Sequence, residues 1–322
     1  MIDITLENFE PELIRASVQT PVLLDIWAPW CGPCKSLSPV LEKLETAYAG
    51  RFLLAKLNSD EEPEIAGQLS QAFGVRSIPF CVMFVGGQPV DGFVGALPEA
   101  QIRAFLDKHV PSADAAEAEE EAEEAEQLAA EGDTTAAIEK LEHALATAPG
   151  DDAIRAELVK QLIDAKRLED AQRHHEPLAQ KADANARAGL PVDARAAALG
   201  MLLEAHAAAA RGRGTDALAA AIAANKRDFD ARFERAQRQL AGGHPTEAMD
   251  ELLEILMRDK EWGDQRARKL YVAILELMTK PVPKAAAATA KTGTLELAGK
   301  ATVVPTDPVV DAYRRKLSMA LF

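Results

Sequence analysis

The pattern of hydrophobic and polar positions divides the chain into two parts. In the first part, short apolar runs at 22–27, 52–57 and 78–85 alternate with stretches in which apolar residues recur at helical spacing. Runs of this length that are bounded by turn residues, such as the two glycines after the third run, predict buried strands. Because strands separated by helices are typical of an α/β sheet, we expect an α/β domain over residues 1–110.

Beyond residue 110 the pattern changes to alanine, glutamate and leucine at helical spacing. Small and large apolar residues alternate over pairs of helical stretches, and a weaker copy of the first pair follows about 34 residues later, which is the period of a tetratricopeptide repeat (TPR). We therefore expect a linker over 111–116 and an all-α, TPR-like helical-repeat domain over 117–279. Such an array presents a grooved surface suited to binding protein segments.

The first repeat helix carries a block of acidic residues. Eight acidic side chains and no basic one lie in 114–126. Alanines also run through this block at helical spacing, at positions 118, 122, 125 and 129. We expect the alanines to face the neighbouring helix and the acids to face solvent; a docking surface for basic partners is the alternative.

The C-terminal part differs again in composition. Residues 280–306 hold prolines, a run of alanines and scattered lysine, threonine and glycine, which predicts a flexible, low-complexity insertion. Asp307 and Pro308 then form a typical helix start, an N-cap followed by a first-turn proline. One apolar stripe follows, formed by Val310, Tyr313, Leu317 and Leu321. We expect an amphipathic helix over 307–322.

Charge and composition narrow the classes of partner. The formal net charge is −15, from 36 basic and 51 acidic residues, which argues against nucleic-acid binding because phosphate contacts need clustered Lys and Arg. No apolar run reaches the ~18–20 residues of a membrane span, and the first residues lack the basic flank and apolar stretch of a signal peptide. Three cysteines are too few for a disulfide framework. We expect a cytoplasmic protein with neither nucleic-acid nor membrane partners.

The strongest chemical signal is the sequence Trp-Cys-Gly-Pro-Cys-Lys at 30–35, directly after the first predicted strand. At a helix start, unpaired backbone N–H groups and the helix dipole favour the thiolate of Cys31. Cys34, one turn later, is close enough to attack a mixed disulfide and release the product. A structural zinc site generally needs four ligands, and no second CxxC or CxxH pair is present. We predict a redox-active disulfide, Cys31–Cys34, with no metal and no other cofactor.

Other candidate groups have simpler interpretations. Cys81 lies in a predicted buried strand, where cysteine usually acts as a small hydrophobic residue, and a regulatory thiol near the redox pair is the alternative. His174 and His175 with Glu176 suggest a metal site at first sight. Adjacent helix positions point in different directions, so we expect exposed side chains there.

Residues 1–110 resemble thioredoxin throughout, through the WCGPC sequence on a strand-to-helix turn and Ile78-Pro79 before a later strand. The resemblance implies that Pro79 is cis and faces the redox pair. It further implies a substrate groove shaped by Pro79 together with Trp30, Ile78, Gly95 and Ala96.

Asp25 and Lys56 occupy positions where thioredoxins place a buried acid and its lysine partner. Burying an ionised carboxylate among leucines and isoleucines is costly, so the pKa of Asp25 should rise. A carboxylate poised in this way can accept the proton of Cys34 during resolution.

Four features together carry a further resemblance: the thioredoxin-like half, the run Gln-Pro-Val-Asp-Gly-Phe at 88–93, the degenerate repeats and the ending Tyr-Arg-Arg-Lys-Leu at 313–317. Through them the chain is similar, over 1–279 and 307–322, to the bacterial YbbN/CnoX co-chaperones, the chaperedoxins. The resemblance implies a stress-response holdase that binds unfolding clients, protects or reduces their cysteines, and passes them to the GroEL chaperonin or the DnaK system. In this family the C-terminal helix is associated with the chaperonin. The candidate docking residues are therefore Tyr313, Arg314, Arg315, Leu317 and Leu321.

Two alternatives remain open. The chain can be a general thioredoxin-type protein disulfide reductase whose repeats only localise it. The final helix can simply pack against the repeats. In either case a cellular thiol reductant would recycle the disulfide.

Overall fold

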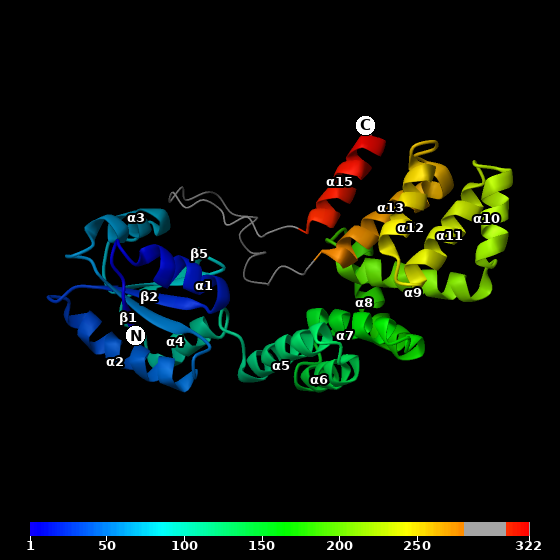
Figure 1. The fold of residues 1–322 in the computed structure, drawn as a ribbon. Coiled ribbons are helices and arrows are strands. Elements are labelled where there is room, and N and C mark those ends of the chain that lie inside the picture. The colour runs from blue at the N-terminus through cyan, green and yellow to red at the C-terminus, as the bar shows by residue number, and fades with distance from the viewer. Residues whose placement is uncertain (280–306, 322) are drawn as a thin grey trace. The chain divides into compact units, whose positions relative to one another are not determined.

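The computed structural model describes residues 1–279 and 307–321; the insertion expected over 280–306 lies outside these residues. Contacts within the chain divide it into two compact units. Unit 1 is Met1–Ala116, and unit 2 comprises 117–279 and 307–321 of the described residues. Figure 1 shows the ribbon of each unit.

Unit 1 is built on a five-stranded sheet in the order β1-β3-β2-β4-β5. The strands are β1 (Ile2–Asp3), β2 (Val22–Trp27), β3 (Leu53–Asn58), β4 (Phe80–Val85) and β5 (Gln88–Val94). Strands β1, β3 and β2 are mutually parallel, and β4 and β5 are antiparallel to their neighbours. The sheet is therefore mixed, and the α/β class expected for this part of the chain is confirmed.

Helices cover both faces of this sheet. They are α1 (Ala16–Gln19), which continues a helical turn at Phe9–Arg15, α2 (Gly32–Ala47), α3 (Pro63–Phe73) and α4 (Glu99–Leu106). Helices α2 and α4 lie on one face of the sheet, and α3 lies on the other (Figure 1). Apolar side chains of α2 and α4 form one cluster with the sheet, and those of α3 and the Phe9–Arg15 segment form another. The domain thus has three layers with the sheet in the middle.

The strand bounds follow from backbone chemistry. Strand β2 spans the predicted residues 22–27, whereas β4 begins at Phe80 instead of Ile78. Pro79 has no backbone N–H to donate to a strand ladder, so pairing starts only after it. The same proline therefore ends up at the edge of the ordered sheet.

The described residues of unit 2 form helices joined by turns, as the repeat pattern predicted. Its helices are α5 (Ala113–Ala130), α6 (Thr134–Thr147), α7 (Asp152–Asp164), α8 (Leu168–Arg187), α9 (Ala194–Arg211), α10 (Thr215–Ala224), α11 (Phe229–Ala241), α12 (Pro245–Leu256), α13 (Trp262–Met278) and α15 (Pro308–Leu321). We expected a linker over 111–116, but α5 begins at Ala113, because the Ser112 hydroxyl accepts the Ala115 N–H and caps the helix.

Aspartate caps set several helix starts in unit 2. The side chains of Asp133, Asp151, Asp193 and Asp228 each accept a hydrogen bond from a backbone N–H in the first turn of the helix that follows. The backbone N–H groups of a first helical turn have no partner inside the helix, so a capping carboxylate stabilises the helix start by about 1 kcal/mol. The chain therefore turns at defined positions between successive helices.

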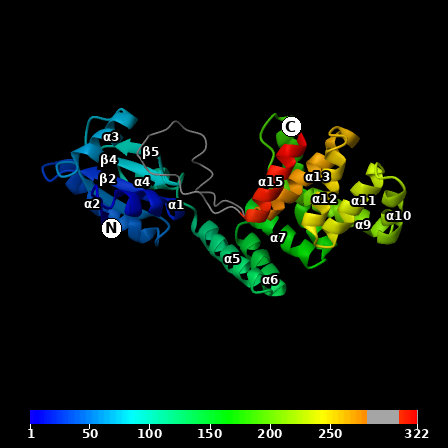
Figure 2. The ribbon, with the colours of Figure 1, turned by 45° about the horizontal axis from the view of Figure 1, so that its top comes forward.

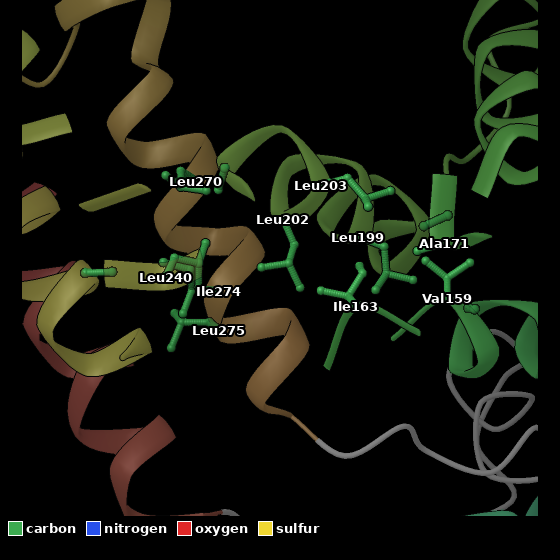
Figure 3. Packing of buried hydrophobic residues seen from close by; sticks show 14 of the residues in the cluster. Val159, Ile163, Ala171, Leu199, Leu202, Leu203, Leu240, Leu270, Ile274 and Leu275 are labelled. Atoms are coloured by element: carbon green, nitrogen blue, oxygen red, sulfur yellow. The ribbon is translucent and has the colours of Figure 1, made fainter. Parts of the chain in front are cut away.

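The core of unit 2 joins helices that are distant in sequence. Ile163 from α7, Leu202 from α9, Leu240 from α11 and Ile274 from α13 meet in one cluster (Figure 3). Each helix contributes one apolar face, which it could not bury alone.

The acidic block lies on the outer face of α5, as expected. Ala118 and Ala125 are buried, whereas seven of the eight acidic residues of 114–126 are exposed and Glu121 is half-buried. Glu121 pairs with His143 and Glu124 pairs with Lys140. The exposed acids therefore form the solvated side of a packed helix.

One expectation in unit 2 is wrong. His175, predicted to be exposed, is buried between α8 and α9, and its Nε2 lies 2.9 Å from the carbonyl oxygen of Ala196. The space comes from Gly200, where an added Cβ would lie 3.0 Å from the imidazole Cε1. The histidine is thus a packing residue that fills the gap left by a glycine.

Helix α15 packs against α12 and α13 (Figure 2). Its start is the predicted one, since the Asp307 side chain accepts the Val309 N–H at 2.7 Å. Val310 and Tyr313 of the apolar stripe are buried there. The C-terminal helix is therefore an integral part of unit 2.

Candidate active site

The two cysteines of the WCGPC sequence form a disulfide at the start of α2. Cys31 is the N-cap residue, and its Sγ accepts the backbone N–H of Cys34 at 3.2 Å. The buried strand β2 ends only four residues earlier, at Trp27, and therefore carries the pair to the edge of the sheet. The redox-active disulfide predicted from the sequence is confirmed.

The position of Cys31 at the start of α2 favours its sulfur, over that of Cys34, as the one that reacts first. Only 4% of Cys31 and 1% of Cys34 is exposed, so Cys31 is the more accessible of the two. The N–H that reaches Cys31 Sγ and the positive end of the α2 dipole both stabilise a negative charge on this sulfur. On reduction, the thiolate is thus favoured at Cys31.

An exposed indole lies beside the disulfide. Trp30 is 70% exposed, and its Nε1–H donates to the carboxylate of Asp60 at 3.1 Å. Asp60 was not among the predicted site residues, because it follows β3 and is distant in sequence. Trp27 and Ile78 pack against the cysteines themselves. A partner protein approaching the disulfide would therefore meet apolar surface.

The backbone around Pro79 has the form expected of the substrate groove. The Ile78–Pro79 peptide bond is cis. Gly95 donates its N–H to the Pro79 carbonyl at 2.8 Å, and its φ of 88° favours glycine. The neighbouring Ala96 is exposed. The structure therefore brings Ile78, Pro79 and Gly95 together near the disulfide, and their role in substrate binding stays a prediction.

Asp25 lies in the middle of β2 and is fully buried. Burial raises the pKa of this carboxyl from 3.8 to about 6, against the smaller opposing effects of the Lys56 charge and a hydrogen bond from Cys81. A carboxyl with this pKa exchanges protons near neutral pH, as a proton acceptor must.

Lys56 stands opposite Asp25 on β3 but makes its ion pair elsewhere. Its Nζ lies 3.0 Å from Oε1 of Glu42 on α2. Glu42 is half-exposed, so this pairing leaves the ammonium group closer to solvent than a pair with the buried Asp25 would. Lys56 therefore acts on Asp25 through its charge.

Cys81 lies in a buried strand, as expected, but the sequence did not reveal which side chain it contacts. It is fully buried on β4, and its Sγ lies 3.7 Å from Oδ1 of Asp25. The two residues are register partners in the antiparallel β2–β4 pair. Only the strand register, which the sequence does not state, brings them together.

The docking residues predicted on α15 differ in their exposure to solvent. Tyr313 is buried, Leu317 and Leu321 are half-buried, and Arg314 and Arg315 are exposed. The Nη2 group of Arg314 donates a hydrogen bond to the Thr279 hydroxyl oxygen at 3.1 Å. The apolar stripe thus faces the repeats, and the basic residues face solvent.

Unit 2 contains a cavity of about 240 Å³ between α7, α9 and α13. Its apolar lining includes the four residues that Figure 3 shows meeting from different helices. The half-buried Leu277 and Met278 extend this lining on α13. Burial and the charge of Lys166 lower the pKa of His206, which also lines the cavity, and therefore favour its neutral form.

In residues 1–279 and 307–321, no three His, Cys, Asp or Glu side chains gather to hold a metal ion. No helix in the same residues is long and apolar enough to cross a membrane.

Comparisons with known proteins agree with this division of the chain. Residues 1–108 match the family profile described as thioredoxin. Residues 128–198 and 208–295 match two profiles described as tetratricopeptide repeat.

Similar curated proteins cover the first third of the chain. Thioredoxin 1 of Nostoc sp. is 42% identical over 107 residues, which are 33% of this chain and 94% of the relative. The thioredoxin of Chlorobaculum thiosulfatiphilum is 46% identical over 104 residues, 32% of this chain and 91% of the relative. The thioredoxin of Haemophilus influenzae is 42% identical over 103 residues, again 32% and 91%.

Proposed function

Because the chain belongs to the thioredoxin family through residues 1–108, we propose that it is a redox-active co-chaperone of the YbbN/CnoX type. It holds unfolding client proteins on its repeats and protects or reduces their cysteines through Cys31 and Cys34. It then passes the clients to the GroEL chaperonin or the DnaK system in the cytoplasm. The observation that carries this proposal is one chain with both a redox disulfide and a TPR unit.

The redox step follows from the disulfide geometry. The Cys31 thiolate attacks one sulfur of a client disulfide, forms a mixed disulfide and releases the other client sulfur as a thiolate, which takes a proton from solvent. Cys34 then gives its proton to Asp25, and its thiolate attacks Cys31 Sγ. The Cys31–Cys34 bond forms as the bond between Cys31 and the client sulfur breaks. The second client sulfur leaves as a thiolate, which takes a proton from solvent, and Asp25 releases its proton to solvent. A cellular dithiol reductant restores the pair.

Client holding is assigned to unit 2. An unfolding chain exposes apolar side chains, and the cavity between α7, α9 and α13 has an apolar lining within reach of solvent. Thiol–disulfide exchange alone requires only a thioredoxin domain, so the extended helical unit needs a separate role. We assign it the binding of apolar client segments.

The deciding experiment measures aggregation of a chemically unfolded client by light scattering in the presence of the Cys31→Ser/Cys34→Ser double variant. Suppression equal to that of the unchanged chain supports holding that is separable from redox chemistry. Loss of suppression, with the unchanged chain active, would favour the reductase alternative.

A second pair of variants tests the cavity. Leu277→Glu places a charge in its apolar lining and should weaken suppression several-fold. Val272→Glu is the matched control, because Val272 lies on the same helix, is 48% exposed and does not line the cavity. Equal activity of the two variants would remove this cavity from the proposal.

The alternative is a general protein disulfide reductase whose repeats only localise it. A specific observation favours it, namely that Cys31, Cys34, Asp25 and Pro79 are all present around one disulfide. Insulin reduction by residues 1–116 and by the full chain at equal rates, together with no aggregation suppression by either, would establish this alternative.

A further inference from the structure

A row of side chains crosses the sheet of unit 1 at the level of Asp25. The strand registers pair Lys56 with Asp25, Asp25 with Cys81, and Cys81 with Phe93. Register partners project to the same face of a sheet, so these four side chains form a row that follows the strand order β3, β2, β4, β5. Cys81 is therefore the neighbour of Asp25 on the side away from Lys56.

The contact between Cys81 and Asp25 is isolated from water. Both residues are fully buried, and 3.7 Å separate Cys81 Sγ from Asp25 Oδ1. The other carboxylate oxygen, Oδ2, has no hydrogen-bond partner among the described residues. An ionised carboxylate in this place is poorly solvated, so each donor that reaches it has a large effect.

The thiol has a proton to donate. Burial, and then the nearby Asp25, raise the pKa of Cys81 well above its ordinary value, so the sulfur remains protonated at neutral pH. The other charged groups near Asp25 among the described residues are Lys56 from β3 and Glu42 of α2, which pairs with that lysine. Among the described residues, Cys81 donates a side-chain hydrogen bond to Asp25, whereas Lys56 donates to Glu42 instead.

We propose that Cys81 is a positioning residue for the redox reaction, whose S–H donates to Oδ1 of Asp25 and thereby keeps this carboxylate ionised and oriented as the proton acceptor for Cys34. The inference rests on the thiol–disulfide exchange proposed above. It gives the third cysteine a role without any oxidation of its own. The proton that Asp25 accepts comes from Cys34, and the proton on Cys81 stays in place throughout.

The proposal predicts the effect of losing the donor. Without the S–H group, the ionised form of Asp25 is less stable, so the pKa of this carboxyl rises. A thiol is a weak donor, and we expect a rise of about half a pH unit. At neutral pH a larger fraction of Asp25 is then protonated and unable to accept the proton of Cys34.

The test compares Cys81→Val, which removes the donor at similar volume, with Cys81→Ser, which keeps one. Two quantities are measured on the full chain: the Asp25 carboxyl titration by carbon NMR, assigned with Asp25→Asn, and the pH profile of insulin reduction. We expect both midpoints to move upward in Cys81→Val and to return toward the original values in Cys81→Ser.

The outcomes separate this inference from the proposed function. An unchanged Asp25 titration in Cys81→Val overturns the inference, and so does a shift that Cys81→Ser fails to reverse, because packing is then the cause. If no variant and not even the unchanged chain reduces insulin, the proposed redox function fails, while the NMR titration still decides whether Cys81 donates to Asp25.

Discussion

The hydroxyl group of Tyr271 on α13 donates a 2.8 Å hydrogen bond to the backbone carbonyl of Tyr313 on α15. Both tyrosines are buried, and their rings lie 6.5 Å apart. Lys316 of α15 adds an ion pair to Asp250 of α12 at 3.2 Å. These contacts hold the C-terminal helix on the repeats, although 42 residues separate the two tyrosines.

Tyr271→Phe should loosen α15 without unfolding unit 2. The change removes one buried hydrogen bond and keeps the ring, so we expect a loss of about 1 kcal/mol in the attachment of the helix. Hydrogen exchange of 308–321, measured by mass spectrometry, should become faster by several-fold. Val272→Ala, an exposed neighbour on α13, is the control, and equal protection in both variants would contradict the assigned role of the hydroxyl.

Chaperonin association should depend on the exposed face of α15. Arg315 is exposed, Met319 is 74% exposed and lies one helical turn later, whereas Tyr313 is occupied by the repeats. The double variant Arg315→Glu/Met319→Ser should therefore weaken binding to GroEL by about tenfold, equivalent to about 1.4 kcal/mol. Binding is measured by interferometry on immobilised chaperonin.

Two controls belong to this measurement. The variant must keep the insulin-reducing activity of the unchanged chain. Deleting 307–322 is a poor substitute, because it also uncovers the apolar surface of α12 and α13. Undiminished binding by the double variant would place any chaperonin contact elsewhere on the chain.

Asp25→Asn should stabilise unit 1 at neutral pH. Folding raises the pKa of Asp25 from 3.8 to about 6. Below a pH of 3.8 the carboxyl is protonated in both states and carries no penalty in the folded one, and the folded state loses stability as the pH rises from there to about 6. Asparagine removes the penalty, and the gain should reach about 3 kcal/mol above the folded pKa.

Calorimetry at about pH 7.5 and about pH 4 checks this sign. The transition of unit 1 should move to higher temperature in Asp25→Asn at the first pH and by much less at the second. Asp3→Asn, at an exposed position on β1, should leave it in place. A gain of equal size at both pH values would show that the raised pKa of Asp25 is not its cause.

Glu251→Gln should destabilise unit 2. Glu251 on α12 accepts from Arg232 at 2.7 Å and also pairs with Arg235, and Arg232 is itself buried. Removing the carboxylate leaves the buried guanidinium of Arg232 with Glu254, at 3.7 Å, as its one acidic partner among the described residues. We expect a loss of about 2 kcal/mol, somewhat below that of an isolated buried pair.

The calorimetric transition that Glu251→Gln lowers should be the one that Asp25→Asn does not move. Glu254→Gln is the matched control, because Glu254 is more exposed and should cost below about 1 kcal/mol. Similar losses in both variants would show that the buried position of Glu251 has no special weight.

The redox pair could be predicted from sequence because its chemistry lies within four consecutive residues at a helix start. Strand β2 was equally predictable, since its apolar run and its bounds coincide. The α5 packing followed from alanines at helical spacing. In each case the information is local along the chain.

The features that could not be predicted depend on contacts between distant segments. Cys81 meets Asp25 across 56 residues, and only the strand register decides which side chain faces the carboxyl. His175 is buried because a glycine on the next helix leaves room for it. The apolar stripe of α15 could be identified from the sequence. An amphipathic helix can pack against its own repeats or bind another protein, and the sequence does not distinguish these two roles.

The placement of the tryptophans has an optical consequence. The chain has three, and two of them, Trp27 and Trp30, adjoin the disulfide, whereas Trp262 lies in unit 2. A disulfide accepts electrons from an excited indole and so quenches its emission, which two thiols do far less. The chain therefore carries its own fluorescence signal for the oxidation state of Cys31 and Cys34.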